Sequence, residues 1–585
     1  ALCSRADPAP YKVWQEYQAE RKKNAKLSWE QYWLPRREKI EAYGFYPHVD
    51  INDCNRGLWW FCDNAAGWWQ SKTVSALEIV RSGTAVSLVA NLIAEPVEYQ
   101  PGKPIVFAIL PHPARPLPEK YRLFNRVAPE QDARASDIYD AFFPWPMNPK
   151  AGEMCVYPAA DPAKPQGGPS WEYAERCAPL MKASKPKGCR TLYLSKAWLS
   201  CRAGAYDNWE WRSGEGSACA LTPSFVNYLC WEMNEWVRRD IWDAIYLDEC
   251  YEHPAQNVEA GMAVRLPDGS MQPGVTNFQF RELMKRWRNL FHAHGKEPML
   301  IAHLTYSFQY PGVVFCDSYL DGENRPIVSV RSSDWIDSTS PAQFEVLQNG
   351  RLWGVSSFYM PFVAEGGFED KSRSQYPRWQ WRMARQAQSQ FAHYETATVY
   401  EGQGAQVYKQ YWKDLLAWGA GSGAATFHPY WDNGAYLQCE GQGGDTLVSL
   451  YRQPGTVRLI ASNRNRQERA VKIKLNLKAL GLREQPTAKS LDSAFGPPAG
   501  ADFVPAEYSP KERERLLGAS TTKTRELLAG EKPHDGLDDL AKENLTLEDP
   551  AAVKARQAGE WEPKLSGDML VVPVRGRDYR VVTLE

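Results

Sequence analysis

The chain has 585 residues, a formal net charge of −1, and 43% hydrophobic residues. Its length exceeds the size at which one hydrophobic core stops growing, so we expect about two to four domains. A net charge this small gives no electrostatic basis for general binding to nucleic acid or an anionic membrane. No apolar stretch reaches the roughly 18 residues of a spanning helix, so we expect no membrane span.

The first part of the chain predicts a helical lead-in and then antiparallel sheet. Residues 1–45 are polar with scattered aromatic residues, as in amphipathic helices. Residues 46–130 contain short β-rich runs such as GLWWFC (57–62), separated by Ser-Gly and Pro-Gly turns. These runs are too few for a complete domain. We therefore predict a partial N-terminal β-sandwich and expect a missing or separate N-terminal segment to accompany it.

Residues 131–437 alternate between strand-like and helix-like patterns. One helix is predicted to open at Thr222 with Pro223 at its first position, and the strand AIYLDE (244–249) follows it. A second helix is predicted from Thr276 to a stop at Gly295. Such alternation is typical of an α/β fold with a parallel sheet, most simply a catalytic (β/α)8 barrel of the TIM type. Residues 438–585 turn β-rich again and predict a C-terminal β-sandwich with a helical or loose insertion at 509–560.

The chain contains 12 cysteines and no C-x-x-C pair, which argues against a structural zinc site. An even number of cysteines is compatible with disulfides, so we expect a secreted or periplasmic protein. Cys250 and Cys316 end apolar runs and are interpreted as buried thiols. No motif indicates a metal or a cofactor.

Polar and aromatic residues collect at the predicted strand ends, where a barrel places its active site. Asp248 and Glu249 form the only Asp-Glu dipeptide in the chain and are the catalytic candidates. Carboxylates beside aromatic rings suit cleavage of glycosidic bonds, which needs an acid, a stabilising negative charge and a surface for the sugar. The candidates for binding a glycan substrate are Lys196, Trp198, Tyr246, His303, Asp317, Asp321, Glu323, Tyr359, His428 and Trp431.

Each of these assignments has a structural alternative. Asp248 and Glu249 could be the solvated end of a strand, His303 a core histidine, and Trp431 a packing residue. Neighbouring residues on a strand face opposite ways, so both acids can serve one site only if the strand ends between them. The following C-Y-E-H-P predicts that it does.

Six segments resemble proteins of the glycoside hydrolase family 123-like group, and the resemblance covers roughly residues 55–435. They are GLWWFCDNAAGWW (57–69), ALEIVRSGTAVSLVANLIAEPVEY (76–99), PIVFAILPHPARPLP (104–118), the run from TPSFVNYL to IYLDE (222–249), LPDGSMQPGVTNFQFRELMKRW (266–287) and HLTYSFQYPGVVFCDSYLDGEN (303–324). The resemblance implies a β-N-acetylgalactosaminidase-related enzyme in which the 2-acetamido group of the substrate is the nucleophile. Asp248 would then orient the acetamide and stabilise an oxazolinium-like intermediate, and Glu249 would be the acid and base.

Two other interpretations stay open at this point. Asp248 could be the nucleophile of a retaining glycosidase, with Asp317, Asp321 or Glu323 as acid and base. Alternatively, the chain could be a non-catalytic protein that binds carbohydrate through aromatic residues.

Overall fold

The structure is a computed structural model. It describes residues 19–24, 47–68, 74–118, 121–129, 141–143, 189–195, 209–212, 219–322, 336, 341–360, 377–398, 405–491 and 561–585, apart from a few positions within these ranges. The chain divides into two compact units, each described here by itself. Unit 1 comprises residues 1–117, 140–320 and 351–355, and unit 2 comprises residues 118–139, 321–350 and 356–585.

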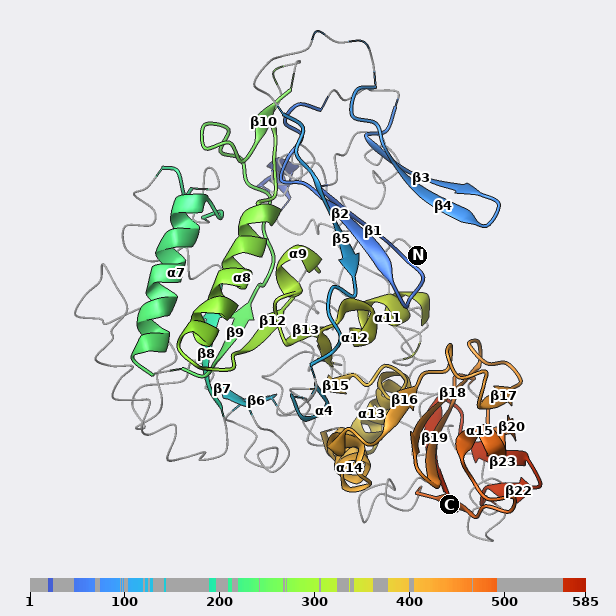
Figure 1. Ribbon diagram of the computed structural model, residues 1–585. Helices are drawn as coiled ribbons and strands as arrows, with labels where there is room; N and C mark the ends of the chain where they lie inside the picture. Colours follow the sequence, from blue (N-terminus) through green and yellow to red (C-terminus); the bar gives the residue numbers. More distant parts are fainter. Residues whose placement is uncertain are drawn as a thin grey trace. The chain divides into compact units, whose positions relative to one another are not determined.

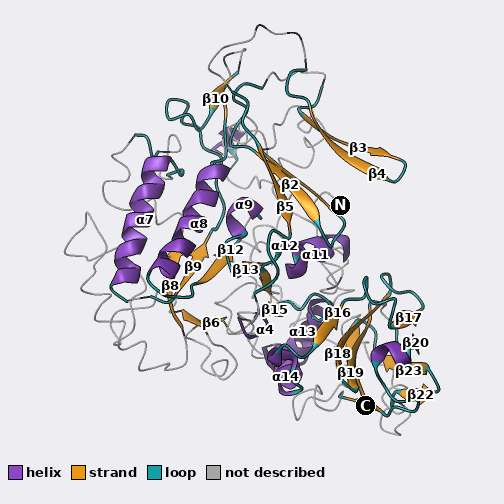
Figure 2. Cartoon of the chain, in the orientation of Figure 1, coloured by secondary structure: helices purple, strands orange, loops and turns teal. Residues whose placement is uncertain are grey.

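In unit 1, residues 19, 20, 22 and 23 of the predicted helical lead-in are helical, and the strands that follow form antiparallel sheet. Strands β1 (His48–Asn52), β2 (Gly57–Phe61) and β5 (Ala108–His112) form one sheet, and β3 (Leu77–Ser82) pairs with β4 (Ala85–Ala90) in a hairpin (Figures 1 and 2). A buried cluster around Trp60, Cys62 and Trp68 packs against apolar residues of the hairpin. On the other face of the sheet, Trp59 packs against Phe308 and Trp353.

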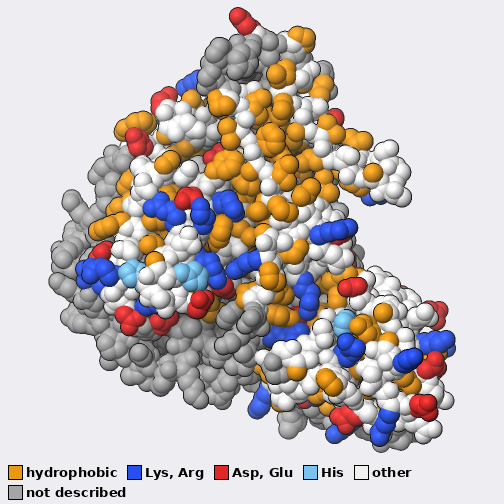
Figure 3. Space-filling model, in the orientation of Figure 1, with side chains coloured by type: hydrophobic (Ala, Val, Ile, Leu, Met, Phe, Trp, Pro, Cys, Tyr) orange, Lys and Arg blue, Asp and Glu red, His pale blue; other side chains and the backbone are white. Residues whose placement is uncertain are grey.

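Part of this sheet keeps an apolar surface. Leu58, Val106, Phe107 and Ile109 are all more than 40% exposed. Figure 3 shows hydrophobic side chains gathered over this region. Large apolar side chains are usually buried, so the exposure of these four together is a departure from the common pattern.

The central part of unit 1 is a row of parallel strands. In sheet order these are β7 (Ala141–Phe143), β8 (Cys189–Ser195), β9 (Ala244–Asp248), β12 (Met299–His303) and β13 (Ser318–Asp321). The spatial order follows the chain order, which is the order expected of successive β-α-β units. Among the described residues of unit 1, no pairing closes this row into a barrel.

Two long helices connect these strands and lie side by side (Figure 1). Helix α7 (Pro223–Arg238) begins after Thr222, whose hydroxyl accepts a hydrogen bond from the backbone N–H of Phe225, as predicted. Helix α8 (Asn277–Ala293) begins after Thr276 and is followed by Gly295 at φ 70°. The apolar side chains that recur at helical spacing along α7 and α8 are buried: Phe225, Leu229, Met233, Trp236, Phe280, Leu283, Trp287 and Phe291. Short elements in the same unit are β10 (Val264–Arg265), β11 (Met271–Gln272) and α9 (Tyr310–Val313).

Unit 2 contains a short parallel pair with helices and a larger antiparallel region. Strand β14 (Ser356–Tyr359) pairs in parallel with β15 (Ala397–Thr398). The helices are α4 (Tyr121–Phe124), α11 (Pro341–Leu347), α13 (Pro377–Phe391) and α14 (Ala405–Ala417), with β6 (Val127–Pro129) and the 3-10 turn η5 (Ala420–Ser422). The short helix α12 (Gly350–Trp353) crosses from unit 2 into unit 1 in the chain.

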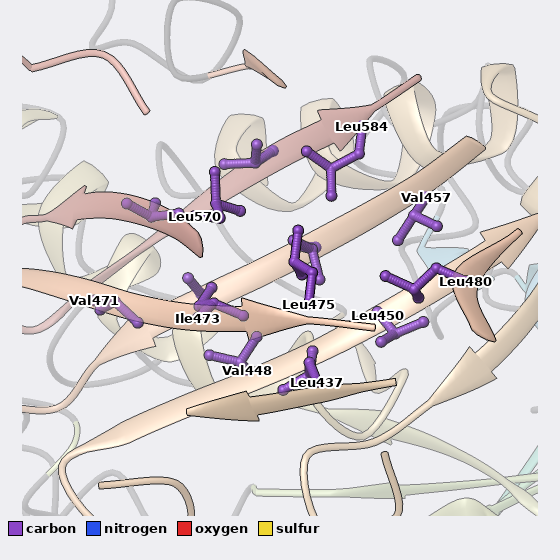
Figure 4. Close-up of a cluster of buried hydrophobic side chains, with 14 of the residues drawn as sticks. Leu437, Val448, Leu450, Val457, Val471, Ile473, Leu475, Leu480, Leu570 and Leu584 are labelled. Carbon is purple, nitrogen blue, oxygen red and sulfur yellow. The ribbon is translucent and has the colours of Figure 1, made fainter. Parts of the chain in front are cut away.

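The C-terminal region of unit 2 has two antiparallel sheets around one core, the arrangement of a β-sandwich. One sheet contains, in order, β16 (Thr426–His428), β18 (Thr446–Gln453), β19 (Thr456–Asn463), β24 (Asp578–Leu584) and β21 (Ala488–Ser490). The other contains β17 (Leu437–Cys439), β20 (Arg469–Leu475), β23 (Met569–Val574) and β22 (Lys564–Ser566), and α15 is Leu477–Leu480. Val448, Leu450, Val471, Ile473 and Leu570 are among the side chains that fill the core (Figure 4). The predicted insertion at 509–560 lies outside the described residues.

Within the described part of the chain, no helix is long and apolar enough to cross a membrane. The described cysteines carry free thiols, and Cys250 and Cys316 are buried, as predicted.

Candidate active site

The Asp248-Glu249 pair lies at the carboxyl end of β9. Residues Ala244–Leu247 are buried, and β9 ends at Asp248, which is partly exposed like Glu249. Glu249 has a φ of 51°, in the left-handed region that a non-glycine residue rarely adopts. The strand therefore ends between the two acids, which was the condition for both to serve one site.

Hydrogen bonds hold this reversal of the chain. Oδ1 of Asp248 accepts a bond of 2.9 Å from the backbone N–H of Glu249. The N–H of Cys250 donates to the backbone oxygen of His303 on the neighbouring strand β12, at 2.7 Å. The two parallel strands thus remain connected beyond the last residue of β9, and Glu249 sits in a turn with both flanks fixed.

His303 and Tyr246 meet Asp248 on one face of the sheet. The register pairs Leu247 with Ala302, which places Asp248 level with His303, and Tyr246 lies two residues earlier on the same face of β9. Nδ1 of His303 lies 2.7 Å from Oδ1 of Asp248 and 2.8 Å from the hydroxyl of Tyr246. Tyr246 is fully buried and the His303 side chain is 4% exposed. Both residues were predicted to bind substrate, but their burial gives them contact with Asp248 instead.

The loop after Glu249 is supported by polar residues that the sequence did not single out. The amide side chain of Gln309 forms two hydrogen bonds with the backbone of Glu252, accepting from its N–H at 2.8 Å and donating to its oxygen at 3.0 Å. The carboxylate of Glu252 accepts from the hydroxyl of Thr276 at 2.5 Å. Glu252 is 2% exposed. The only sign of its role in the sequence is its position as the acidic residue of C-Y-E-H-P.

The start of helix α8 is capped from the N-terminal sheet. Thr276 makes no side-chain cap bond to α8, and the carboxylate of Asp63 accepts instead from the N–H of Phe278 at 2.8 Å. Burial raises the pKa of Asp63 to about 7, and the nearby charge of Glu252 adds to this, whereas the bond from Phe278 opposes it. Asp63 therefore fixes the start of α8. Thr276, directly before this helix, contacts Glu252 in the loop that follows the catalytic candidates.

Asp317 is not at the predicted edge of the sheet. It precedes β13 and forms hydrogen bonds with the start of β12, accepting from the N–H of Leu300 at 2.9 Å. Its two carboxylate oxygens lie 3.0 and 3.1 Å from Nη1 of Arg288. Burial raises the pKa of Asp317, and Arg288 acts in the opposite direction. The apolar run before Asp317 belongs to α9 and the turn after it, so the strand starts later than predicted and Asp317 lies at its amino end.

Asp321 and Tyr359 belong to unit 2 and are both buried. The carboxylate of Asp321 accepts from Nε2 of Gln348 at 2.8 Å and from the N–H of Gly322 at 2.7 Å. Tyr359, at the end of β14, packs against Phe344 and Phe391 in a hydrophobic cluster. Because these contacts are with buried groups of the protein itself, they indicate a structural role for Asp321 and Tyr359.

His428 and Trp431 also differ from their predicted position. His428 ends β16, which pairs antiparallel with β18 and belongs to the C-terminal β-sandwich rather than to a parallel strand of the central sheet. Its ring lies 4.4 Å from that of Tyr436. Trp431 stacks on Tyr394 at 5.4 Å and meets Tyr430 edge-on at 4.8 Å. Packing therefore accounts for the contacts of Trp431. The remaining candidates, Lys196, Trp198 and Glu323, lie outside the described residues.

The site that the structure assembles thus consists of Asp248 and Glu249, with His303 and Tyr246 behind Asp248. In this arrangement Asp248, whose carboxylate is held in place, can stabilise positive charge on a substrate. Glu249, which is partly exposed beside it, can transfer a proton. Among the described residues, no group of three His, Cys, Asp or Glu side chains is placed to bind a metal ion.

Comparisons with known proteins return no matching family model and no matching curated protein. Solved structures with a distant likeness include an α-amylase from Anoxybacillus, at 8% identity over 78% of this chain and 88% of that one, with a TM-score of 0.43. Another is a maltogenic α-amylase from Thermotoga neapolitana, at 8% identity over 79% and 99%, with a TM-score of 0.41. A third is a glycoside hydrolase family 27 β-L-arabinopyranosidase from Geobacillus stearothermophilus, at 8% identity over 80% and 94%, with a TM-score of 0.39. Likenesses this weak do not establish the fold or the activity of this chain.

Proposed function

We propose that this chain is a retaining glycoside hydrolase that cleaves a β-linked 2-acetamido sugar from a glycan by substrate-assisted catalysis. The observation that carries the proposal is the end of β9, where Asp248 is held by His303 and Glu249 turns away in the left-handed conformation. A non-glycine residue in that conformation carries a backbone cost that functional sites commonly retain. The family 123-like segments agree with this assignment, and with it we propose a closed (β/α)8 barrel and a secreted or periplasmic location.

In the proposed first step, the acetamide oxygen of the substrate attacks the anomeric carbon as the bond to the leaving oxygen breaks. Glu249 gives its proton to that oxygen, and the Asp248 carboxylate accepts a hydrogen bond from the acetamide N–H and stabilises the cationic oxazolinium ring. In the second step, Glu249 takes a proton from water as the water oxygen attacks the same carbon. The ring opens, the acetamide is restored, and the β configuration is retained. Substrate-assisted hydrolysis of this kind is a known departure from the scheme with two separated carboxylates.

The test compares the unaltered chain with Glu249→Gln on aryl 2-acetamido-2-deoxy-β-glycosides of the galacto and gluco series. Loss of the general acid is expected to lower kcat by about 10²- to 10⁴-fold, and less for leaving groups that need no proton. The matched control is Glu282→Gln, because Glu282 lies on α8 with its side chain 41% exposed and forms an ion pair with the neighbouring Lys285. This control should keep the original kcat.

Three outcomes would contradict the proposal. Equal hydrolysis of glycosides without the acetamido group would exclude assistance by the substrate. A covalent glycosyl adduct on Asp248 would favour the nucleophile mechanism. Binding of glycans that survives Glu249→Gln, with no turnover by the unaltered chain, would favour a carbohydrate-binding protein.

A further inference from the structure

Nδ1 of His303 approaches two oxygens at once. It lies 2.7 Å from Oδ1 of Asp248 and 2.8 Å from the hydroxyl of Tyr246. An imidazole nitrogen carries either one hydrogen or one lone pair. When Asp248 is ionised it can only accept, so Nδ1 must carry the hydrogen. With Asp248 ionised, these contacts require a hydrogen on Nδ1 of His303, with the carboxylate of Asp248 as the charged acceptor and the oxygen of Tyr246 as the second contact.

The same oxygen of Asp248 is held from a second direction. Oδ1 also accepts from the backbone N–H of Glu249 at 2.9 Å. Two donors on one oxygen restrict the rotation of the carboxylate about its last torsion and favour its charged form. One of these donors belongs to the acid/base residue itself, so the orientation of Asp248 and the turn that carries Glu249 depend on each other.

Burial separates this pair of side chains from substrate contact. Tyr246 is fully buried, and the His303 side chain is 4% exposed, whereas that of Asp248 is 18% exposed. The hydrogen-bonded series thus runs from the interior of the sheet to a partly exposed carboxylate. In the interior, such a bond is not weakened by exchange with water.

We propose that His303 and Tyr246 are positioning residues that fix the orientation of Asp248 and keep it charged while it acts on the acetamide group. This inference rests on the proposed function, because it assigns a role to Asp248 within that reaction. Neither residue transfers a proton to the substrate. Their effect reaches the substrate through Asp248, which must stay ionised to accept the acetamide N–H and to stabilise the cationic intermediate.

The test uses two substitutions of similar shape. His303→Asn places an amide N–H close to the position of Nδ1, whereas His303→Leu has similar size and no donor. We expect kcat for His303→Asn within about tenfold of the unaltered chain, and a further loss of about 100-fold for His303→Leu, the scale on which misplacement of a reacting group acts. We also expect the acidic limb of the kcat/KM profile of His303→Leu to move to higher pH, because Asp248 loses the donor that favours its charge.

A purely structural role would produce a different pattern. In that case, both His303 variants would lose activity equally or keep it equally, and the acidic limb would not move; either result overturns the proposal. If His303→Leu fails to fold, Tyr246→Phe serves instead, because it removes one oxygen from a fully buried ring. Loss of one hydrogen bond of ordinary net strength predicts a fall in kcat of about 2- to 10-fold for this variant, with KM unchanged. An unchanged kcat would overturn the role of Tyr246.

A measurement without turnover separates this proposal from the proposed function. Nitrogen NMR of the histidine side chains reports which ring nitrogen of His303 carries hydrogen. The Nδ1–H form in the unaltered chain, where the carboxylate of Asp248 can only accept, supports the positioning role. The Nε2–H form overturns it whatever the activity. If the unaltered chain shows the Nδ1–H form but hydrolyses none of the 2-acetamido glycosides, the proposed function is wrong and with it the catalytic use of this contact.

Discussion

Asp63 predicts an unusual dependence of stability on pH. Its carboxylate caps α8 through Phe278, and burial together with the charge of Glu252 raises its pKa from 3.8 to about 7. The folded chain therefore binds this proton more tightly than the unfolded chain does. The corresponding stabilisation is fully present below about pH 4 and is lost progressively as the pH rises to about 7. This direction is opposite to that of an acid in a salt bridge.

The perturbation is Asp63→Asn, which keeps an oxygen acceptor for Phe278 and stays neutral at every pH. A shift of about three pKa units corresponds to about 4 kcal/mol in the free energy of unfolding. Since Asp63 keeps partial contact with solvent, we expect about half of this, ~2 kcal/mol. The variant should match the unaltered chain near pH 4 and become more stable than it by pH 8.

The assay is urea unfolding between pH 4 and 8, read together with hydrogen exchange of peptides from α8. The matched control is Asp53→Asn, an exposed acid in the turn before β2 whose pKa is lowered, by bonds from Asn55 and Arg56 that outweigh desolvation. It should show no gain between pH 5 and 8. A stability difference for Asp63→Asn that is the same at pH 5 and pH 8, or that reverses in sign, would refute the reasoning.

Two further predictions concern Glu249, in the candidate site, and Asp317, which the structure places at the amino end of β13. Glu249→Gly should raise the free energy of unfolding by about 1 kcal/mol, because glycine accepts a φ of 51° without strain, and should abolish turnover; urea unfolding that shows no gain would mean that the turn is not strained. Asp317→Asn should lower the stability by about 3 kcal/mol, because it leaves the guanidinium of Arg288 without its charge partner, while the folded fraction keeps its kcat. A hundredfold loss of kcat at unchanged stability would instead return Asp317 to the role of acid and base.

The helices of unit 1 could be predicted because several local signals agreed at each end. Thr222 and Pro223 begin α7, and the left-handed Gly295 follows α8. The apolar spacing between these ends places the buried faces correctly. Such signals depend on a few neighbouring residues and therefore survive without knowledge of the tertiary structure.

The errors concern short strands, where local signals are ambiguous. A brief apolar run can be a strand or a turn of helix, so the sequence pattern of VVFC before Asp317 suits a strand, although β13 begins only at Ser318. Strand β16 has the composition expected of a barrel strand, but only its antiparallel partner β18 reveals that it belongs to the sandwich. The roles of Asp63 and Gln309 depend on contacts across long separations in sequence, and no local pattern reports these.

The position of the Asp-Glu pair follows from strand geometry once the end of β9 is known. Inside a strand the two side chains would point to opposite faces, and one acid would be lost from the site. The left-handed turn at Glu249 removes this constraint, but it can be kept only if other contacts offset its cost of about 1–3 kcal/mol. The bonds from Glu249 to Asp248 and from Cys250 to the His303 backbone supply such contacts, and both act on the residues flanking the turn. The contacts that stabilise the turn are therefore also those that orient Asp248, so a substitution that loosens one should disturb the other.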